Sequence, residues 1–219
     1  MKKNFVLFFL FIFPIVAYLF FATGVNHYTK LPILTPKLPE LGNWNSLDNQ
    51  KVRLTNKITI LGFPGGDVLM NRGNISNLNE KIYKEFYKFR DLQFVMICPI
   101  GTEADVKKIS DALKPSTDMS RWNFVFASKE DIQQLFSEMK LKEDKLNANS
   151  GTSKVYIVDK ERNLRGRKVQ NDKEYKEGYD TFHMAELYNE MTDDVKIILY
   201  DYRAALKKNH NATKQVLPE

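Results

Sequence analysis

A short apolar run, followed by a glycine-rich loop and an amphipathic helix, constrains the fold of this chain more than any other feature. Residues 57–63 (Lys-Ile-Thr-Ile-Leu-Gly-Phe) are mostly β-branched or apolar, which is typical of a strand buried on both faces. The loop at 64–73 begins with Pro-Gly-Gly and ends the strand. A helix should follow, because apolar residues recur there at helical spacing. They are Ile75, Leu78, Ile82, Phe86 and Phe89.

Three more buried strands are predicted farther along the chain. Residues 92–98 and 122–126 are apolar runs of strand length, and 155–159 is another. A tight turn at 160–163 then leads into 164–169, which we interpret as the hairpin partner of the preceding strand. The closing part of the sheet should therefore be antiparallel.

Helices are predicted between these strands and after the hairpin. Thr102 and Ser128 each precede an acidic residue at the third following position, a pattern typical of a helix N-terminus. Residues 140–151 are charged and are expected to form a flexible loop, whereas 183–207 has a helical apolar stripe. The stripe consists of Met184, Leu187, Met191, Val195, Ile198 and Tyr202. Alternating strands and helices predict an α/β, thioredoxin-like fold, a central mixed sheet with helices on both faces.

The N-terminal segment predicts a membrane helix in front of this domain. Residues 5–23 are uncharged and mostly apolar, and about 20 such residues span a bilayer core. Lys2 and Lys3 precede the segment, so the positive-inside rule places the bulk of the chain in the periplasm or another extracytoplasmic space. A cleaved signal peptide is the alternative, although Ala22-Thr23-Gly24 is a poor cleavage site.

These observations predict five consecutive regions. They are a cytoplasmic start at 1–4, a transmembrane signal-anchor helix at 5–23, a proline-rich juxtamembrane linker at 24–43, a thioredoxin-like domain at 44–208 and a disordered tail at 209–219. The linker is predicted from three prolines in eight residues between Pro32 and Pro39.

Composition excludes several classes of site. The chain of 219 residues has one cysteine, so it can form no intrachain disulfide, no CxxC redox pair and no zinc site with several cysteines. The net charge is +6 and the basic and acidic residues are interspersed, without a basic-aromatic motif. We therefore expect no nucleic-acid partner.

An anchor helix, a proline-rich linker and a thioredoxin-like domain, in this order, resemble the SCO/SenC family. Those proteins are membrane-anchored copper chaperones and thiol-disulfide reductases of cytochrome oxidase assembly. The best-matching stretches are Leu31-Pro-Ile-Leu, Ile58 to Phe63, Ile75-Ser-Asn-Leu78, and Val155 to Asp159 leading into Arg165-Gly166. The resemblance implies a thioredoxin-like fold over most of 31–207.

The residues that carry the family's chemistry are replaced in this chain. The family has two cysteines in C-x-x-x-C-P at the loop–helix junction and a histidine ahead of the fourth strand. An ungapped alignment places the cysteine positions on Asp67 and Asn71, with Arg72 in place of the proline, and the histidine position near Ser150-Gly151. The resemblance therefore implies a degenerate site with no metal and no cofactor, in which Asp67 and Asn71 remain as candidate binding residues.

Several functions remain open from the sequence. We expect no enzymatic activity, and instead a binding or assembly module with an unknown protein partner, linked by resemblance to respiratory-complex (cytochrome oxidase) biogenesis. The alternative is a thiol enzyme or copper-handling protein that uses Cys98, with Met96 two residues away on the same strand face. Buried strand cysteines are more often part of the core. A third reading is a structural anchor domain whose partner docks on the long C-terminal helix.

Overall fold

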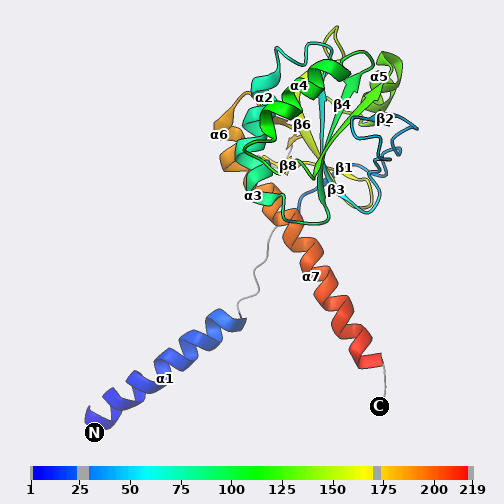
Figure 1. The fold of residues 1–219 in the computed structure, drawn as a ribbon. Helices are drawn as coiled ribbons and strands as arrows, with labels where there is room; N and C mark the ends of the chain where they lie inside the picture. The colour runs from blue at the N-terminus through cyan, green and yellow to red at the C-terminus, as the bar shows by residue number, and fades with distance from the viewer. Residues whose placement is uncertain (1, 24–29, 170–173, 217–219) are drawn as a thin grey trace.

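The computed structural model describes the backbone of residues 2–23, 30–169 and 174–216 (Figure 1). Its centre is an eight-stranded mixed sheet, in which seven strands follow the order β1-β7-β6-β3-β4-β5-β2 and β10 pairs with β6. The strands are β1 (Ile33–Thr35), β2 (Asn45–Ser46), β3 (Ile58–Pro64), β4 (Leu92–Pro99), β5 (Trp122–Ala127), β6 (Gly151–Val158), β7 (Leu164–Arg165) and β10 (Tyr179–Asp180). β3, β4 and β5 are parallel, whereas β6 is antiparallel to β3.

Helical segments lie on both faces of this sheet, as the sequence predicts. They are α2 (Arg72–Leu78), η1 (Asn79–Tyr83), α3 (Lys84–Phe86), α4 (Glu103–Leu113), α5 (Lys129–Glu138), α6 (Met184–Glu186), η2 (Leu187–Met191) and α7 (Thr192–Val216). The π-helical turns η1 and η2 interrupt the two helices predicted at 75–89 and 183–207. A separate ribbon pairs β8 (Arg167–Lys168) with β9 (Tyr175–Lys176).

Two hydrophobic cores, one on each face, hold the layers together. The α2–α3 segment, α4 and the η2–α7 segment pack on one face, whereas α5 packs on the other. Neighbouring strand residues point to opposite faces, so Ile60 belongs to the first core and Leu61 and Phe63 to the second. The central strands β3 and β4 are buried along their whole length, which confirms the two-sided burial predicted from their apolar composition.

One of the two predicted helix caps is confirmed and one is wrong. The backbone N–H of Asp131 donates to Ser128 Oγ at 3.0 Å, and Ser128 has the extended backbone of an N-cap. Thr102 occupies the same position before α4 but makes no side-chain cap. Its hydroxyl instead donates to the Pro99 carbonyl at 2.8 Å, and its backbone (φ −97°, ψ 4°) is not extended.

The predicted boundaries of the domain need correction at both ends. The linker predicted at 24–43 is in part folded, because β1 pairs with β7 and because Leu31, Leu38 and Leu41 are buried. The apolar residues among and beside the prolines are the physical reason, since Leu31 packs in one core and Leu38 and Leu41 pack in the other. At the other end, α7 continues to Val216, into the stretch predicted as a tail.

The hairpin and the last helix also differ from the prediction in detail. β7 covers two residues of the partner strand predicted at 164–169, and β8 turns away to pair with β9 instead. Met184 is 43% exposed although the stripe pattern predicts it to be buried. Leu187, Met191, Val195 and Ile198 are buried as predicted.

The helix α1 (Lys2–Thr23) covers the segment predicted as a signal anchor and contains Pro14. Large apolar side chains between Val6 and Leu19 are exposed to solvent along it. Within the part of the chain that the structure describes, none of the helices combines the length and the apolar character needed to cross a membrane.

Candidate functional site

The loop after β3 and the loop before β6 meet at one end of the sheet. The last residue of β3, Pro64, is in register with Gly151, the first residue of β6. The backbone N–H of Gly66 donates to the carbonyl oxygen of Asn149 at 2.8 Å. The fold therefore brings Asp67 close to the Ser150-Gly151 pair. In the alignment, Asp67 stands at a cysteine position of the family and the pair stands near its histidine position.

The two loops touch backbone to backbone at a pair of glycines. A Cβ atom on Gly151 would lie 2.9 Å from Gly65 Cα and 3.0 Å from the Pro64 carbonyl oxygen. Gly65 itself has a φ of +76°, which favours glycine. Side chains larger than hydrogen do not fit at either position, so an imidazole on Gly151 would push the loops apart.

Asn149 is the residue whose side chain faces the loop after β3. Its Nδ2 donates to Asp67 Oδ2, an interaction between residues 82 positions apart in sequence. Sequence reasoning missed Asn149 because the alignment without gaps points to the two residues that follow it. Ser150, by contrast, is buried and has a left-handed backbone with φ 59°.

The second aligned position, Asn71, is bound within its own loop. Its Nδ2 donates to the Pro64 carbonyl at 3.0 Å, and its backbone N–H donates to the Asp67 carbonyl at 3.1 Å. The polar groups of Asp67, Asn71 and Asn149 thus hold the loop in one shape. None of these three side chains is a thiol or an imidazole, so none of the three is a soft metal ligand.

A small cavity lies behind Asn71. Its volume is about 20 Å³, and its lining includes Gly62, Asn71, Met96, Thr152 and Thr181. Such a volume holds a single water molecule. Gly62 has no room for a side chain, because an added Cβ would lie 2.7 Å from Met96 Sδ. Larger ligands would have to bind on the outer surface of the loops.

Cys98 does not take part in this site. Its side chain is fully buried in β4 and belongs to the same core as Met96, as expected for two residues on one strand face. The thiol contacts the Met96 carbonyl oxygen at 3.8 Å. Burial, with a smaller contribution from the charge of Glu103, raises the pKa of the thiol far above its ordinary value. Within the described residues, no group of three or more His, Cys, Asp or Glu side chains is arranged to hold a metal ion.

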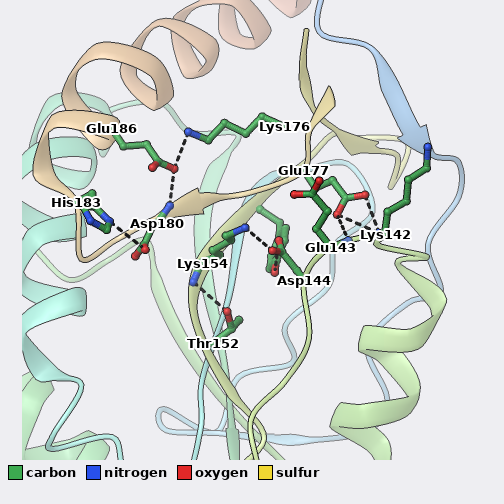
Figure 2. Close-up of polar contacts among 11 residues, drawn as sticks. Lys142, Glu143, Asp144, Thr152, Lys154, Lys176, Glu177, Asp180, His183 and Glu186 are labelled. Carbon is green, nitrogen blue, oxygen red and sulfur yellow. Dashed lines mark hydrogen bonds and ion pairs between the residues drawn. The ribbon is translucent and has the colours of Figure 1, made fainter. Parts of the chain in front are cut away.

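A network of charged side chains braces the segment beside the site (Figure 2). Asp144 accepts hydrogen bonds from Lys154 and from the Tyr156 hydroxyl, and the Glu177 carboxylate accepts from the backbone N–H of Lys142 at 2.9 Å. Partial burial lowers the pKa of Lys154, but its bond to Asp144 outweighs this effect and raises it. These contacts fix part of the stretch at 140–151 that the sequence predicts to be flexible.

Three large apolar side chains are exposed in loops at the same end of the sheet. β10 runs in the same direction as β3 and β4, so the loops that follow these three strands lie at the same end of the sheet. These loops expose Met70 by 85%, Ile100 by 66% and Phe182 by 71%. Isolated exposed apolar residues are common; these three, which we call the apolar rim, share the end of the sheet that carries the candidate site.

Comparison with known proteins supports the fold. The sequence matches no protein-family model and no curated protein. The structure resembles BsSco, a member of the Sco family of cytochrome c oxidase assembly proteins, with a TM-score of 0.53 and 14% identity over 78% of this chain and 98% of that one.

Two further solved structures are similar. Copper-bound ScoI from Arabidopsis thaliana has a TM-score of 0.43 and 16% identity, covering 73% of this chain and 98% of that one. A thiol:disulfide interchange protein from Chlorobium tepidum has a TM-score of 0.48 and 17% identity, covering 75% and 96%. The likeness to BsSco establishes a thioredoxin-like fold for this chain, and its resemblance to Sco-family proteins is confirmed at the level of the fold.

Proposed function

We propose that this chain is a membrane-anchored, extracytoplasmic thioredoxin-like domain that binds a protein partner during assembly of a respiratory complex and performs no redox chemistry. One observation carries the proposal. The loop after β3, which carries two cysteines in the family that this chain resembles, is held here by the hydrogen bonds of Asp67, Asn71 and Asn149, and Cys98 is buried in the core.

The chemistry of thiols supports the proposed absence of redox activity. Disulfide exchange within one chain requires an attacking thiolate and a second, resolving thiol. Cys98 supplies one sulfur, and its burial and raised pKa disfavour the thiolate. The single-cysteine enzyme is therefore the less supported alternative.

The partner would contact the apolar rim formed by Met70, Ile100 and Phe182.

Reductase assays on the wild-type chain should remain at background, and Cys98→Ser should leave them unchanged. Turnover that disappears in Cys98→Ser would overturn the non-catalytic reading.

The membrane anchor rests on the sequence of residues 5–23 and on the side chains of α1. The segment lacks charge, and large apolar side chains are exposed from Val6 to Leu19, an arrangement that suits an apolar environment better than water. We expect the chain to resist carbonate extraction and the domain after Lys30 to be cleaved by protease added to spheroplasts. Recovery of a shortened, carbonate-soluble chain would instead indicate a cleaved signal peptide.

The link to cytochrome oxidase assembly rests on the likeness to BsSco. Deletion of the gene should lower cytochrome oxidase activity in the source organism, and both the wild-type chain and Cys98→Ser should restore it. Oxidase activity that is unchanged by the deletion would refute this link. Failure of Cys98→Ser alone would favour the thiol alternative.

Copper binding provides a test of the site geometry. Oxygen and amide ligands suit Cu(I) poorly, so the wild-type chain should not retain Cu(I) against a chelator. Restoring soft ligands with Asp67→Cys, Asn71→Cys and Asn149→His should produce binding, because Asn149 already faces Asp67. The matched control replaces Asn149→His by Gly151→His, which we expect to destabilise the loop. Retention of one Cu(I) per wild-type chain would contradict the proposal.

A further inference from the structure

We infer that the loop from Leu41 to Val52, which we call the β2 loop, forms a binding site for a neutral saccharide. The loop contains β2, which pairs with β5 and lies at the edge of the sheet (Figure 1). This site shares no residue with the candidate site described above. It requires neither the membrane anchor nor a protein partner, so it stands apart from the proposed function.

The β2 loop encloses a pocket of about 350 Å³. This volume lies within the range of small-molecule sites. Leu41, Val52 and Val125 form the apolar part of its lining. The polar part consists of Asn43, Asn45, Ser46, Asn49, Gln50 and Lys51.

Side-chain amides dominate this polar lining, since Asn43, Asn45, Asn49 and Gln50 all contribute one. Each amide has an oxygen that accepts hydrogen bonds and a nitrogen that donates them. Within the residues that the structure describes, the side chains of Asn45, Asn49 and Gln50 make no hydrogen bond, so their amides are available to a ligand. Hydroxyl groups also both donate and accept, which makes a row of hydroxyls the matching ligand surface.

The pocket carries little charge. Among the residues that the structure describes, Lys51 is the one charged residue in the lining, and its Nζ donates to Asn43 Oδ1 at 3.3 Å. Charged residues make up 27% of the chain, so a nearly uncharged lining is a distinct feature of this pocket. An ionic ligand would find no set of opposite charges here, whereas a neutral polyhydroxyl ligand needs none.

Trp44 adds a flat apolar surface to the amides. Its side chain lines the pocket, is partly exposed and packs against the second core. Gly42 makes room for the indole, because a Cβ there would lie 2.5 Å from Trp44 Nε1. A sugar ring has C–H groups on its faces and hydroxyls at its edges. An indole beside several amides therefore matches both kinds of surface.

Hydrogen bonds hold the β2 loop in this shape without a ligand. Ser46 Oγ donates to the Gln50 carbonyl at 2.7 Å and accepts from the Gln50 N–H at 2.8 Å. The Asn49 N–H donates to the Ser46 carbonyl at 3.1 Å, and Asn49 has a left-handed backbone with φ 54°. The Leu47 N–H donates to the Phe124 carbonyl at 2.9 Å, which ties the loop to β5. Such preorganisation lowers the entropic cost of binding.

Nuclear magnetic resonance of the full chain tests the site. Chitotriose and maltotriose are the neutral saccharides titrated, with tetraalanine as the peptide probe and trigalacturonate as the anionic probe. The chain has two tryptophans, and the indole signal of Trp122 is an internal control because this side chain is buried and its Nε1 donates to Asn79 at 3.3 Å. Because α1 exposes large apolar side chains, the chain is kept in a zwitterionic detergent without a sugar headgroup.

We expect at least one neutral saccharide to shift the indole signal of Trp44 saturably and to leave that of Trp122 in place. Asn49→Gly removes one amide but suits the left-handed backbone, so it should weaken saccharide affinity about fivefold through the loss of one hydrogen bond. The matched control is Asn56→Gly, which also changes an asparagine with a left-handed backbone (φ 64°) but lies outside the pocket. Its affinity should equal that of the wild-type chain.

Three outcomes would overturn the saccharide site. The first is a Trp44 signal that neither saccharide shifts saturably. The second is a stronger response to tetraalanine or trigalacturonate, which would assign the pocket to a peptide or to an anion. The third is equal weakening by Asn49→Gly and Asn56→Gly, which would show that the amide of Asn49 does not contact the ligand.

Discussion

Gly151→Ala should loosen the candidate site by separating its two loops. The added Cβ would lie 2.9 Å from Gly65 Cα, 3.0 Å from the Pro64 carbonyl oxygen and 3.1 Å from Gly65 N. All three neighbours are backbone atoms, so no side chain can rotate to relieve the contact. Overpacking of this kind costs typically about 1 to 3 kcal/mol. Loss of the hydrogen bond from Gly66 N–H to the Asn149 carbonyl would add about 1 kcal/mol.

Urea unfolding followed by tryptophan fluorescence measures this cost, because Trp122 is buried in the core. The matched control is Gly73→Ala in α2, where an added Cβ meets nothing within 4 Å. Alanine there should be neutral or stabilise the chain by up to about 1 kcal/mol. Hydrogen exchange at the Gly66 amide should be faster in Gly151→Ala only. Equal midpoints for the two variants, with the Gly66 amide still protected, would refute the close glycine packing.

Three further predictions follow from burial and hydrogen bonding. Phe63→Ala should lower the free energy of unfolding by about 3–5 kcal/mol, because Phe63 is 1% exposed and its ring centroid lies 5.3 Å from that of Phe136. A loss below about 1 kcal/mol in urea unfolding would contradict this. Cys98 should react with a thiol reagent only in denaturant, because burial raises its pKa; rapid reaction of the native chain would show an open strand end. Burial raises the pKa of Glu40, but bonds from the Leu54 and Thr55 N–H groups and the Thr55 hydroxyl outweigh it and lower the pKa below 4.5. Its stabilising effect should thus be full above pH 4.5 and be lost as the pH falls through the folded-state pKa; Glu40→Gln should flatten this acid dependence of urea midpoints, and an unchanged dependence would contradict the assignment.

Much of the fold could be predicted from the sequence because the decisive signals are local. β3 and β4 are continuous apolar runs, and such runs bury both faces of a strand wherever they sit in the sheet. The Ser128 cap depends on a residue three positions away, so its pattern suffices. Thr102 shows the limit, because its hydroxyl bonds to Pro99 instead, and only the backbone geometry reveals this choice.

The candidate site depended on contacts between distant parts of the chain. The sequence by itself determined that two thiols are absent and that Asp67 and Asn71 stand in the loop after β3. Only the tertiary structure identified Asn149 as the partner of Asp67 and excluded a side chain at Gly151. Burial of Cys98, by contrast, is already favoured by the apolar run at 92–98, and the position of β4 within the sheet confirms it. The physical reason is that side-chain patterns encode burial, whereas which loops touch depends on strand pairing between residues far apart in sequence.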